Sequence, residues 1–231
     1  MHSYKTVFFD LDHTLWDFNQ NCAETLHELY HIYELEQFGF SILDFQKTYR
    51  YINDSMWEGY HKNEITKDQL RTERFPRTFT ILGIDQSKVP IKIDTHFIEL
   101  CPTKPHVHVN TFEILEYLKT KGYALHIITN GFSETQYVKM KYSGLESFFE
   151  SLIHADHTGY KKPEPQIFDY ALSTTNSKAE SSIMIGDDLF ADVLGAKKMG
   201  MGNVFYNIDK KTHNEDIQYE ISNLIELKNI L

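Results

Sequence analysis

The first pattern along the chain is a short apolar run that stops at two aspartates. Residues 5–9 read Lys-Thr-Val-Phe-Phe, and the polar residues Asp10 and Asp12 come directly after them. A compact apolar run of this length is typical of a strand that is buried on both faces. We therefore predict a buried strand over residues 5–9 that ends in a polar loop.

Residues 17–98 carry a different pattern, in which apolar and aromatic residues recur every three or four positions. The positions that define it are Leu26, Leu29, Tyr30 and Tyr33; Phe45, Tyr49, Ile52, Met56 and Tyr60; and Leu70, Phe75, Phe79 and Leu82. Thr66 followed by Asp68 and Gln69 resembles a helix start, and Gly83 resembles a helix stop. This spacing predicts four helices and no strands in the block.

After Pro102 the pattern changes to alternating strands and helices. Helices are predicted over residues 112–121, 133–143, 164–173 and 190–199, and strands over residues 124–128, 151–155, 182–185 and 203–206. Such an alternation implies a parallel sheet with helices on both faces. The predicted fold class is therefore α/β, with a Rossmann-like parallel sheet. Residues 1–16 and 102–231 would form this core domain, and residues 17–101 a helical domain inserted after the first strand.

Polar residues directly follow four of the predicted strands. They are Asp10 and Asp12, then Thr129-Asn130-Gly131, then Asp156, and finally Gly186-Asp187-Asp188. Because ligands bind outside the carboxyl ends of parallel strands, we expect these residues to converge on one rim. Asp10 and Asp12 share a face if the strand geometry continues, and two carboxylates so close repel and need a cation. Mg²⁺, which prefers oxygen ligands, suits them, and Asp187 or Asp188 could complete the cluster.

The composition limits the class of protein and its partners. The chain has 231 residues, 41% of them hydrophobic and 24% charged, which is typical of a folded globular protein. A formal net charge of −10 argues against polymeric nucleic acid or an anionic membrane as a partner. The start of the chain is too short for a signal peptide, so we expect a cytoplasmic protein, by default a monomer. Cys22 and Cys101 lack metal-ligand spacing and are expected to be reduced thiols.

Four segments, taken in order, resemble the motifs of the haloacid dehalogenase-like superfamily of phosphatases. They are Phe8-Phe-Asp-Leu-Asp-His-Thr-Leu15, Ile127-Ile-Thr-Asn-Gly131, Tyr160-Lys-Lys-Pro-Glu-Pro165 and Ile185-Gly-Asp-Asp-Leu-Phe-Ala-Asp192. Each alone could be an ordinary turn or a solvated loop, but their order at predicted strand ends argues against that reading. The resemblance covers nearly the whole chain. The choice of Lys162 over Lys161 for the third motif rests on the family's habit of a Lys-Pro pair.

The resemblance implies a magnesium-dependent phosphohydrolase that forms an aspartyl-phosphate on Asp10, the nucleophile. Asp12 would protonate the leaving group and then activate water. Dehalogenases of the superfamily lack an acid at that position, so Asp12 argues for a phosphate ester. Lys162 would offset the negative charge between carboxylate and phosphate. The remaining implied roles are phosphate binding by Thr129, Asn130 and Gly131, magnesium binding by Asp10, the Asp12 carbonyl and Asp187, and support from Asp188 and Asp192.

The helical insertion resembles the small cap of this family, which closes over the rim and reads the leaving group. Its hinges are expected near residues 16–18 and 100–103. Local matches at residues 12–16, 56–60, 128–132 and 167–172 resemble the branch that contains bacterial pyrimidine 5′-nucleotidases. The implied substrate is a nucleoside monophosphate.

Several alternatives stay open at this point. The substrate could be another small metabolite, such as phosphoglycolate or a sugar phosphate, and a phosphotransferase such as a mutase would use the same chemistry. A binding module without activity is disfavoured, because Asp10, Asp12 and Lys162 are all present. A histidine metal site built from His106 and His108, or from His154 and His157, is a weaker alternative, since lone histidines are usually structural.

Overall fold

The protein is described here by a computed structural model that covers residues 4–231. The chain forms two compact units. One consists of the chain up to Phe18 together with Pro105–Leu231, and the other is Asn19–Lys104. The role of the second unit as a cap, with the boundaries expected from the sequence, stays a prediction.

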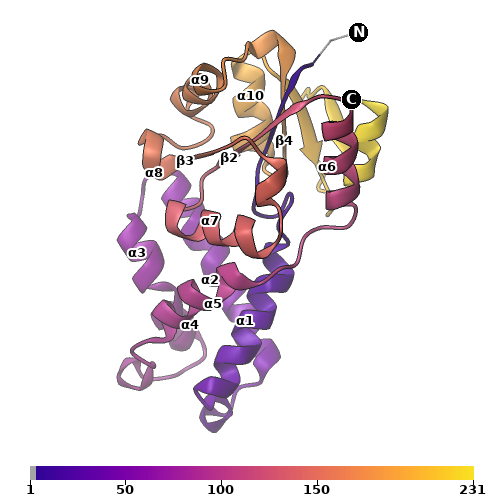
Figure 1. The fold of residues 1–231 in the computed structure, drawn as a ribbon. Coiled ribbons are helices and arrows are strands. Elements are labelled where there is room, and N and C mark those ends of the chain that lie inside the picture. Colours follow the sequence, from indigo (N-terminus) through magenta and orange to yellow (C-terminus); the bar gives the residue numbers. More distant parts are fainter. Residues whose placement is uncertain (1–3) are drawn as a thin grey trace. The chain divides into compact units, whose positions relative to one another are not determined.

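The first unit is built on a parallel sheet (Figure 1). Its strands are β1 (Thr6–Phe9), β2 (Ala124–Thr129), β3 (Ser151–His154), β4 (Ser182–Gly186), β5 (Gly202–Tyr206) and β6 (Tyr219–Ile221), in the order β3-β2-β1-β4-β5-β6. The first strand lies in the middle, where Phe9 pairs with Ile127 of β2 on one side and Ile185 of β4 on the other. The predicted α/β fold with a Rossmann-like parallel sheet is confirmed. The short strand β6 was not expected from the sequence.

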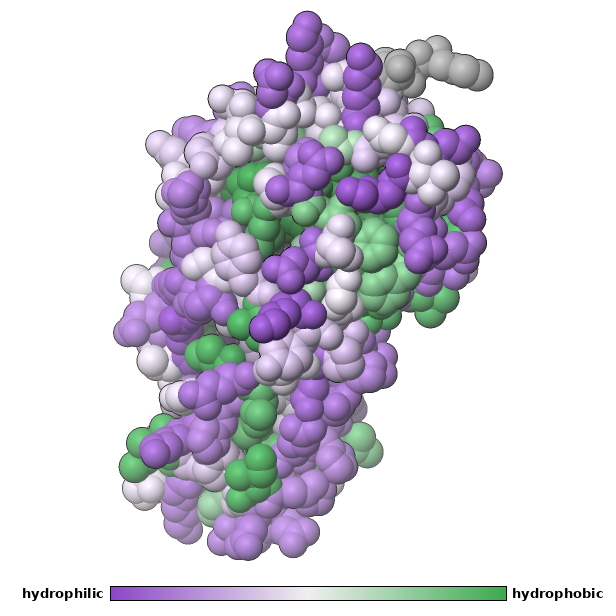
Figure 2. All heavy atoms as spheres, viewed as in Figure 1, coloured by the Kyte–Doolittle hydropathy of each residue, from purple (hydrophilic) through white to green (hydrophobic). Residues whose placement is uncertain are grey.

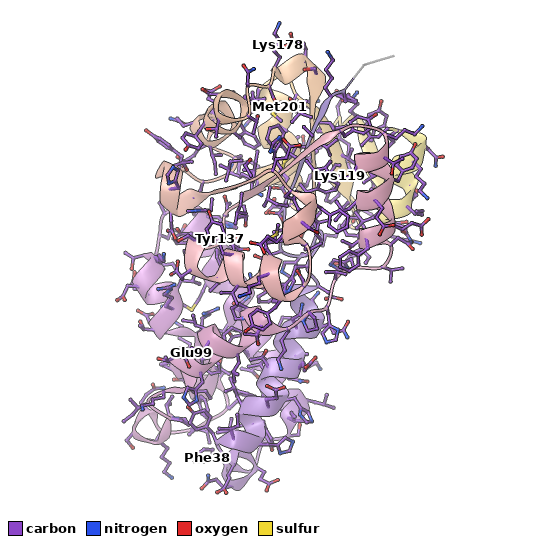
Figure 3. The ribbon with its side chains drawn as sticks, in the orientation of Figure 1. Phe38, Glu99, Lys119, Tyr137, Lys178 and Met201 are labelled. Atoms are coloured by element: carbon purple, nitrogen blue, oxygen red, sulfur yellow. The ribbon has the colours of Figure 1, made fainter. Side chains whose placement is uncertain are left out.

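Both faces of the sheet are covered, because strand residues that point in opposite directions are equally buried. Phe8 of β1 belongs to an apolar cluster with Ile128 and Met184 of the neighbouring strands and Phe168 of helix α9 (Pro165–Thr174). Val7 and Phe9, which point to the other face, are also fully buried. The helices of this unit are α6 (Thr111–Thr120), α7 (Ser133–Tyr142), α8 (Ala155–Thr158), α9 (Pro165–Thr174) and α10 (Gly195–Lys198). Met201 lies inside the unit and Lys178 at its surface (Figure 3).

The helix predicted over residues 190–199 has two parts. A π-helix covers Leu189–Leu194, and α10 continues it over four residues. Asp188 caps the π-helix, since its carboxylate accepts hydrogen bonds from the backbone amides of Phe190 and Ala191. The wider π-helical turn, which often occurs at functional sites, therefore begins at the end of β4.

The second unit is helical, and the described part of it contains no strand. Its helices are α1 (Phe18–Ile32, which starts at the last residue of the first unit), α2 (Ile42–His61), α3 (Lys67–Thr72), α4 (Arg74–Ile81) and α5 (Ile93–Leu100). The prediction of four helices is therefore wrong. The chain breaks at Glu73 between α3 and α4, and Pro76 lies in the first turn of α4, where its missing N–H costs little.

The predicted start and stop signals of this unit are confirmed. The Thr66 hydroxyl accepts a hydrogen bond from the backbone amide of Gln69, whose side chain bonds back to Thr66. Gly83 follows α4 with a φ of 77°, a left-handed conformation that favours glycine. The interior is aromatic, with Tyr49 and Phe75 in ring contact at 4.8 Å. The helices of this unit are therefore bounded by local signals and packed by aromatic rings.

Hydrophilic residues cover most of the visible surface, and hydrophobic residues gather in several patches between them (Figure 2). This distribution is usual for a folded protein with a buried apolar core. Among the described residues, none of the helices is both long and apolar enough to span a lipid bilayer.

Candidate active site

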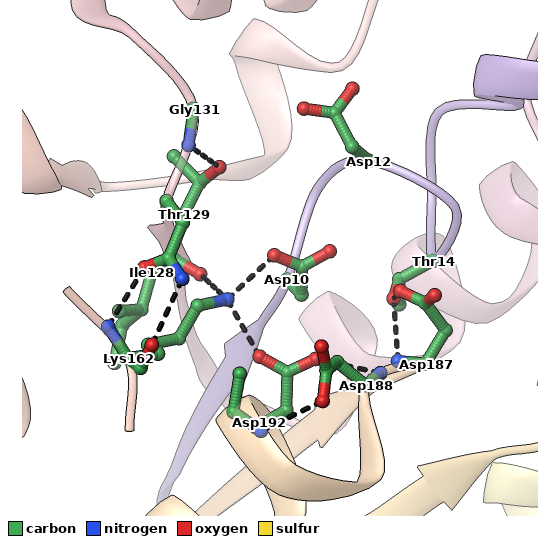
Figure 4. A network of polar contacts seen from close by, with 12 residues as sticks. Asp10, Asp12, Thr14, Ile128, Thr129, Gly131, Lys162, Asp187, Asp188 and Asp192 are labelled. Carbon is green, nitrogen blue, oxygen red and sulfur yellow. Dashed lines mark hydrogen bonds and ion pairs between the residues drawn. The ribbon is translucent and has the colours of Figure 1, made fainter. Parts of the chain in front are cut away.

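A buried ionic cluster lies at the carboxyl end of β1 and centres on Lys162 (Figure 4). The Nζ of Lys162 lies 2.6 Å from Oδ1 of Asp10 and 2.6 Å from Oδ1 of Asp192. It also donates a hydrogen bond of 2.6 Å to the carbonyl oxygen of Ile128. The side chains of Lys162 and Asp192 are only 2% and 1% exposed. Because buried charges need opposite charges, these contacts fix the position of Asp10.

Asn130, at the end of β2, holds the backbone of Lys162 in place. The backbone amide of Lys162 donates to Oδ1 of Asn130 at 2.8 Å, and Nδ2 of Asn130 donates to the carbonyl oxygen of Lys162 at 3.0 Å. Of the two neighbouring lysines that the sequence offers, Lys162 is the one in the cluster. The side chain of Asn130 thus connects the β2 segment to the lysine that contacts Asp10.

Asp187 reaches the same place from the end of β4. Its Oδ1 accepts a hydrogen bond of 3.0 Å from the Thr14 hydroxyl, and its backbone amide donates to that hydroxyl oxygen at 3.1 Å. The next backbone amide, that of Asp188, donates to Oδ2 of Asp192 at 3.1 Å. The side chain of Asp188 caps the π-helix. Asp188 therefore contacts the cluster through its backbone amide and not through its carboxylate.

The charges of the cluster change the pKa values of its members. Burial raises the pKa of Asp10 above its ordinary value, and the nearby ammonium of Lys162 opposes that shift. Burial would lower the pKa of Lys162, but the carboxylates of Asp10 and Asp192 outweigh burial and raise it. Burial and the negative charge of Asp10 raise the pKa of Asp187 to about 8. The cluster is therefore short of positive charge.

A divalent cation fits this shortage. Asp10, Asp187 and Asp192 each offer one ligand atom, and these atoms lie within 4.8 Å of one another. Both oxygens of Asp192 already have partners, Lys162 and the Asp188 amide. The carboxylates of Asp10 and Asp187 are thus the ones best placed to hold a cation, and oxygen ligands of this kind suit Mg²⁺.

Asp12 does not share a face with Asp10 as the sequence suggested. The strand stops at Phe9, and the following loop turns back so that the amide of Trp16 bonds the carbonyl of Leu11 at 2.8 Å. The carboxylate of Asp12 consequently points away from that of Asp10 (Figure 4). The condition that strand geometry continues beyond Phe9 is not met.

Two side chains of α7 hold the carboxylate of Asp12 instead. The Nζ of Lys139 lies 2.6 Å from its Oδ1, and Nε2 of Gln136 donates to its Oδ2 at 3.1 Å. Neither residue belongs to the four motif segments of the sequence. The available signal is that they lie three positions apart, on one face of a helix that begins just after the Thr129-Asn130-Gly131 segment.

The Thr129-Asn130-Gly131 segment leads from β2 into α7. The backbone amide of Gly131 donates to the Thr129 hydroxyl oxygen at 3.0 Å, which leaves the hydroxyl proton for another acceptor. Asp156, which we expected at the same rim, accepts a hydrogen bond of 3.1 Å from the Ser133 amide at the start of α7. Asp156 is not a member of the acidic group formed by the described residues around Asp10.

The histidine alternative receives no support. Nε2 of His157 lies 2.8 Å from the hydroxyl of Tyr170. The backbone amide of His157 donates to Nδ1 of His154. Within residues 4–231, no group of three metal-ligating side chains contains a histidine. His154 and His157 are thus engaged in local hydrogen bonds.

The sequence matches the haloacid dehalogenase-like hydrolase family over residues 7–205. The chain belongs to the haloacid dehalogenase-like hydrolase family. YfnB of Bacillus subtilis, a protein named as a HAD-hydrolase, is 29% identical over all of this chain and 97% of its own length. Its solved structure, with magnesium bound, has a TM-score of 0.87 at 28% identity and covers 99% of this chain and 98% of YfnB. The family assignment made from the four motifs is therefore confirmed.

Two further relatives of this haloacid dehalogenase-like hydrolase carry names that state a reaction. The pyrimidine 5′-nucleotidase YjjG of Escherichia coli is 29% identical and covers 97% of this chain and 96% of its own length. A glyceraldehyde 3-phosphate phosphatase of Methanothermobacter thermautotrophicus is 29% identical and covers 88% of this chain and 85% of its own length. The chain is thus similar over most of its length to enzymes named for two different phosphate esters.

Proposed function

We propose that this hydrolase removes phosphate from small phosphomonoesters, with Asp10 as nucleophile and Asp12 as general acid and base. The observation that carries the proposal is the contact of 2.6 Å between Asp10 and the buried Lys162. A carboxylate beside a fixed ammonium is held in one position, and the ammonium offsets the charge of an approaching phosphate. Thr129, Asn130 and Gly131 border the same cluster and are proposed to bind phosphoryl oxygens.

In the first proposed step, a carboxylate oxygen of Asp10 attacks phosphorus. The bond between phosphorus and the leaving oxygen breaks, and its electron pair stays on that oxygen. Asp12 gives this oxygen its proton, so the products are an alcohol and an aspartyl-phosphate on Asp10. The covalent intermediate divides one difficult displacement into two.

In the second proposed step, water cleaves the aspartyl-phosphate. The carboxylate of Asp12 takes a proton from water while the water oxygen attacks phosphorus. The bond between phosphorus and Asp10 breaks, its electron pair returns to the Asp10 carboxylate, and inorganic phosphate leaves. Asp10 and Asp12 are then in their starting states, so one ester and one water give one alcohol and one phosphate.

Magnesium is the proposed cofactor, held by Asp10, Asp187 and the backbone carbonyl of Asp12. When bound, Mg²⁺ supplies charge neutralisation for the transferred phosphoryl group. The raised pKa of Asp187, caused by burial and by Asp10, supports a cation at this point. Asp192 would support Lys162 through their ion pair. Asp188 would support the end of β4 by capping the π-helix that follows it.

A nucleoside 5′-monophosphate is the proposed substrate, and the similarity to YjjG over 97% of this chain supports it. A sugar phosphate is the second candidate, supported by the similarity to the glyceraldehyde 3-phosphate phosphatase. Both are small phosphorylated metabolites, and we propose that the protein acts on them as a cytoplasmic monomer.

The test is phosphate release from a panel of esters. Purified protein is given nucleoside 5′-monophosphates, glyceraldehyde 3-phosphate, phosphoglycolate and p-nitrophenyl phosphate, with Mg²⁺ and then with a chelator. We expect magnesium-dependent release, fastest from a pyrimidine nucleotide. Preference for glyceraldehyde 3-phosphate would favour the second candidate. Absence of release from every ester by folded protein with Mg²⁺ would overturn the proposal.

A further inference from the structure

We propose that Lys139 and Gln136 of α7 are positioning residues that orient the carboxyl group of Asp12, which takes up a proton before it serves the leaving group and is an ionised carboxylate when it activates water. The inference rests on the proposed function, because it assigns the role of general acid to Asp12. It adds two residues to the site, and neither of them is expected to touch the reacting atoms.

Lys139 is held in a way that makes Asp12 its main ionic partner. Its side chain is 8% exposed, and Nζ lies 2.6 Å from Oδ1 of Asp12. The same ammonium lies 4.6 Å from the ring centre of Trp16, whose side chain is fully buried. A buried ammonium is stable only beside negative charge or an aromatic face, and this one has both. Lys139 therefore has one preferred place, and it holds Asp12 there.

Gln136 holds the other oxygen of Asp12. Its side chain is 1% exposed, and Nε2 donates to Oδ2 of Asp12 at 3.1 Å. Its Oε1 is buried with no hydrogen-bond partner among the described residues. Leaving a buried acceptor without a partner costs free energy, so Oε1 does not favour this position of the amide. The hydrogen bond from Nε2 to Asp12 is what orients it.

Gly131 makes room for this amide. A Cβ atom at position 131 would lie 1.7 Å from Nε2 of Gln136, far closer than two atoms can approach. The absence of a side chain there allows the Gln136 amide to reach Asp12. Tyr137, next along the same helix, is 55% exposed (Figure 3).

Both oxygens of the Asp12 carboxylate thus have a donor from a single helix. That helix begins directly after the proposed phosphate-binding segment, so α7 connects the position of the phosphate to the position of the acid. Without the two donors, Asp12 would rotate among its side-chain rotamers, and proton transfer depends on its geometry. The loss should be specific to leaving groups that need a proton.

The first experiment compares two kinds of ester in Lys139→Met and Gln136→Leu. The leaving group of p-nitrophenyl phosphate departs without a proton, whereas the alkoxide of an alkyl ester needs one. We compare kcat/KM, which reports the steps up to departure of the first product, for p-nitrophenyl phosphate and for the panel's best alkyl ester. We expect each variant to lose about tenfold to a hundredfold on the alkyl ester and less than about threefold on p-nitrophenyl phosphate.

Lys141→Met is the matched control, because Lys141 lies on the same helix with an exposed side chain. It should leave both values of kcat/KM unchanged. Lys139→Arg keeps a positive donor and should recover most of the activity lost on the alkyl ester. An equal loss on both esters in Lys139→Met, or no loss at all, would overturn the positioning role.

The second experiment tests the contact without measuring activity. A double-mutant cycle of Asp12→Asn and Lys139→Met is measured as the urea midpoint of unfolding. We expect the double variant to be less destabilised than the sum of the single variants, and additive shifts would contradict the contact. If the wild type hydrolyses neither ester, the proposed function and the positioning role both fail, whereas a non-additive cycle would still establish the contact.

Discussion

The Nζ of Lys162 lies 2.6 Å from Oδ1 of Asp10, although 152 positions separate the two residues in the chain. The parallel sheet brings them together, because Asp10 follows the central strand and Asn130 of the adjacent strand holds the Lys162 backbone. This one contact joins the first and third motifs of the family. It also makes the stability of the core depend on residues of the candidate active site.

Lys162→Met should destabilise the protein strongly. The substitution leaves the buried carboxylates of Asp10 and Asp192 without their ammonium, and removing one partner of a buried ion pair costs about 3–5 kcal/mol. Urea denaturation of the metal-free protein measures the free energy of unfolding. Lys161→Met, at the neighbouring half-buried lysine, should change it much less, because Lys161 lies outside the ion pairs with Asp10 and Asp192.

If Lys162→Met does not fold, a second variant keeps this prediction testable. Adding Asp192→Asn removes one of the two uncompensated charges, so the double variant should recover part of the lost stability. Equal effects of Lys161→Met and Lys162→Met would contradict the central place of Lys162 in the cluster.

Asp10→Asn should fold and lose turnover. Asparagine keeps the volume of the side chain and removes both the nucleophilic oxygen and one negative charge from a cluster that is short of positive charge. We expect kcat to fall by at least about 10³-fold, as for removal of a catalytic nucleophile, with a change in stability of no more than about 1 kcal/mol. Phosphate release and circular dichroism measure the two effects, and near-normal activity would refute Asp10 as the nucleophile.

Gly186→Ala should disturb Asp192. A Cβ atom at position 186 would lie 2.1 Å from Oδ2 and 2.6 Å from Cβ of Asp192, so the backbone or the aspartate must move. Overpacking of this kind costs about 1–3 kcal/mol. Gly59→Ala is the matched control, since a Cβ there meets its nearest neighbour at 3.7 Å inside helix α2. That control should be neutral or stabilising by up to about 1 kcal/mol, and equal destabilisation by both variants would contradict the prediction.

The contribution of Asp187 to the stability of the metal-free protein should fall as the pH rises from about 4, the ordinary range of an unfolded aspartate, to about 8. Burial and the charge of Asp10 raise the pKa of Asp187 to about 8 in the folded state. Between these values the folded state holds a proton that the unfolded state has lost, so raising the pH favours unfolding. Thermal unfolding in a chelator, at constant ionic strength, measures this slope.

Magnesium should reverse that trend. The ion replaces the proton on Asp187, so the gain in Tm on adding Mg²⁺ should be larger at pH 8 than at pH 5. Asp187→Asn should reduce both the pH slope in chelator and the gain from Mg²⁺. A gain from Mg²⁺ that is the same at both pH values and in the variant would argue against Asp187 as a ligand.

Much of the fold was predictable, because its elements carry their signals locally. Buried parallel strands have continuous apolar sequences, and the caps at Thr66 and Gly83 lie within a few residues of the helix ends they mark. The strand β6 has only three residues, and its middle residue, Glu220, is exposed. A segment with so little apolar sequence becomes a strand only because β5 offers an edge to pair with.

The site was predictable in its residues but not in its orientations. The motifs identified Asp10, Lys162 and Asp187, which meet because each follows or faces a strand end. The direction of the Asp12 side chain depends on a loop that turns after Phe9. The apolar run that predicts the strand carries no signal for this turn. Lys139 was missed because a lysine on a helix is usually solvated, and its burial depends on distant contacts.

The central position of β1 has a consequence for the order of events during synthesis. The segment Thr6–Phe9 leaves the ribosome before both of its partners, Ala124–Thr129 and Ser182–Gly186. Both edges of this apolar strand are therefore paired only after most of the chain has been made. Strand pairing between residues far apart in the sequence forms slowly. The acidic group of Asp10, Asp187 and Asp192 can therefore form only after the chain has been made as far as residue 192.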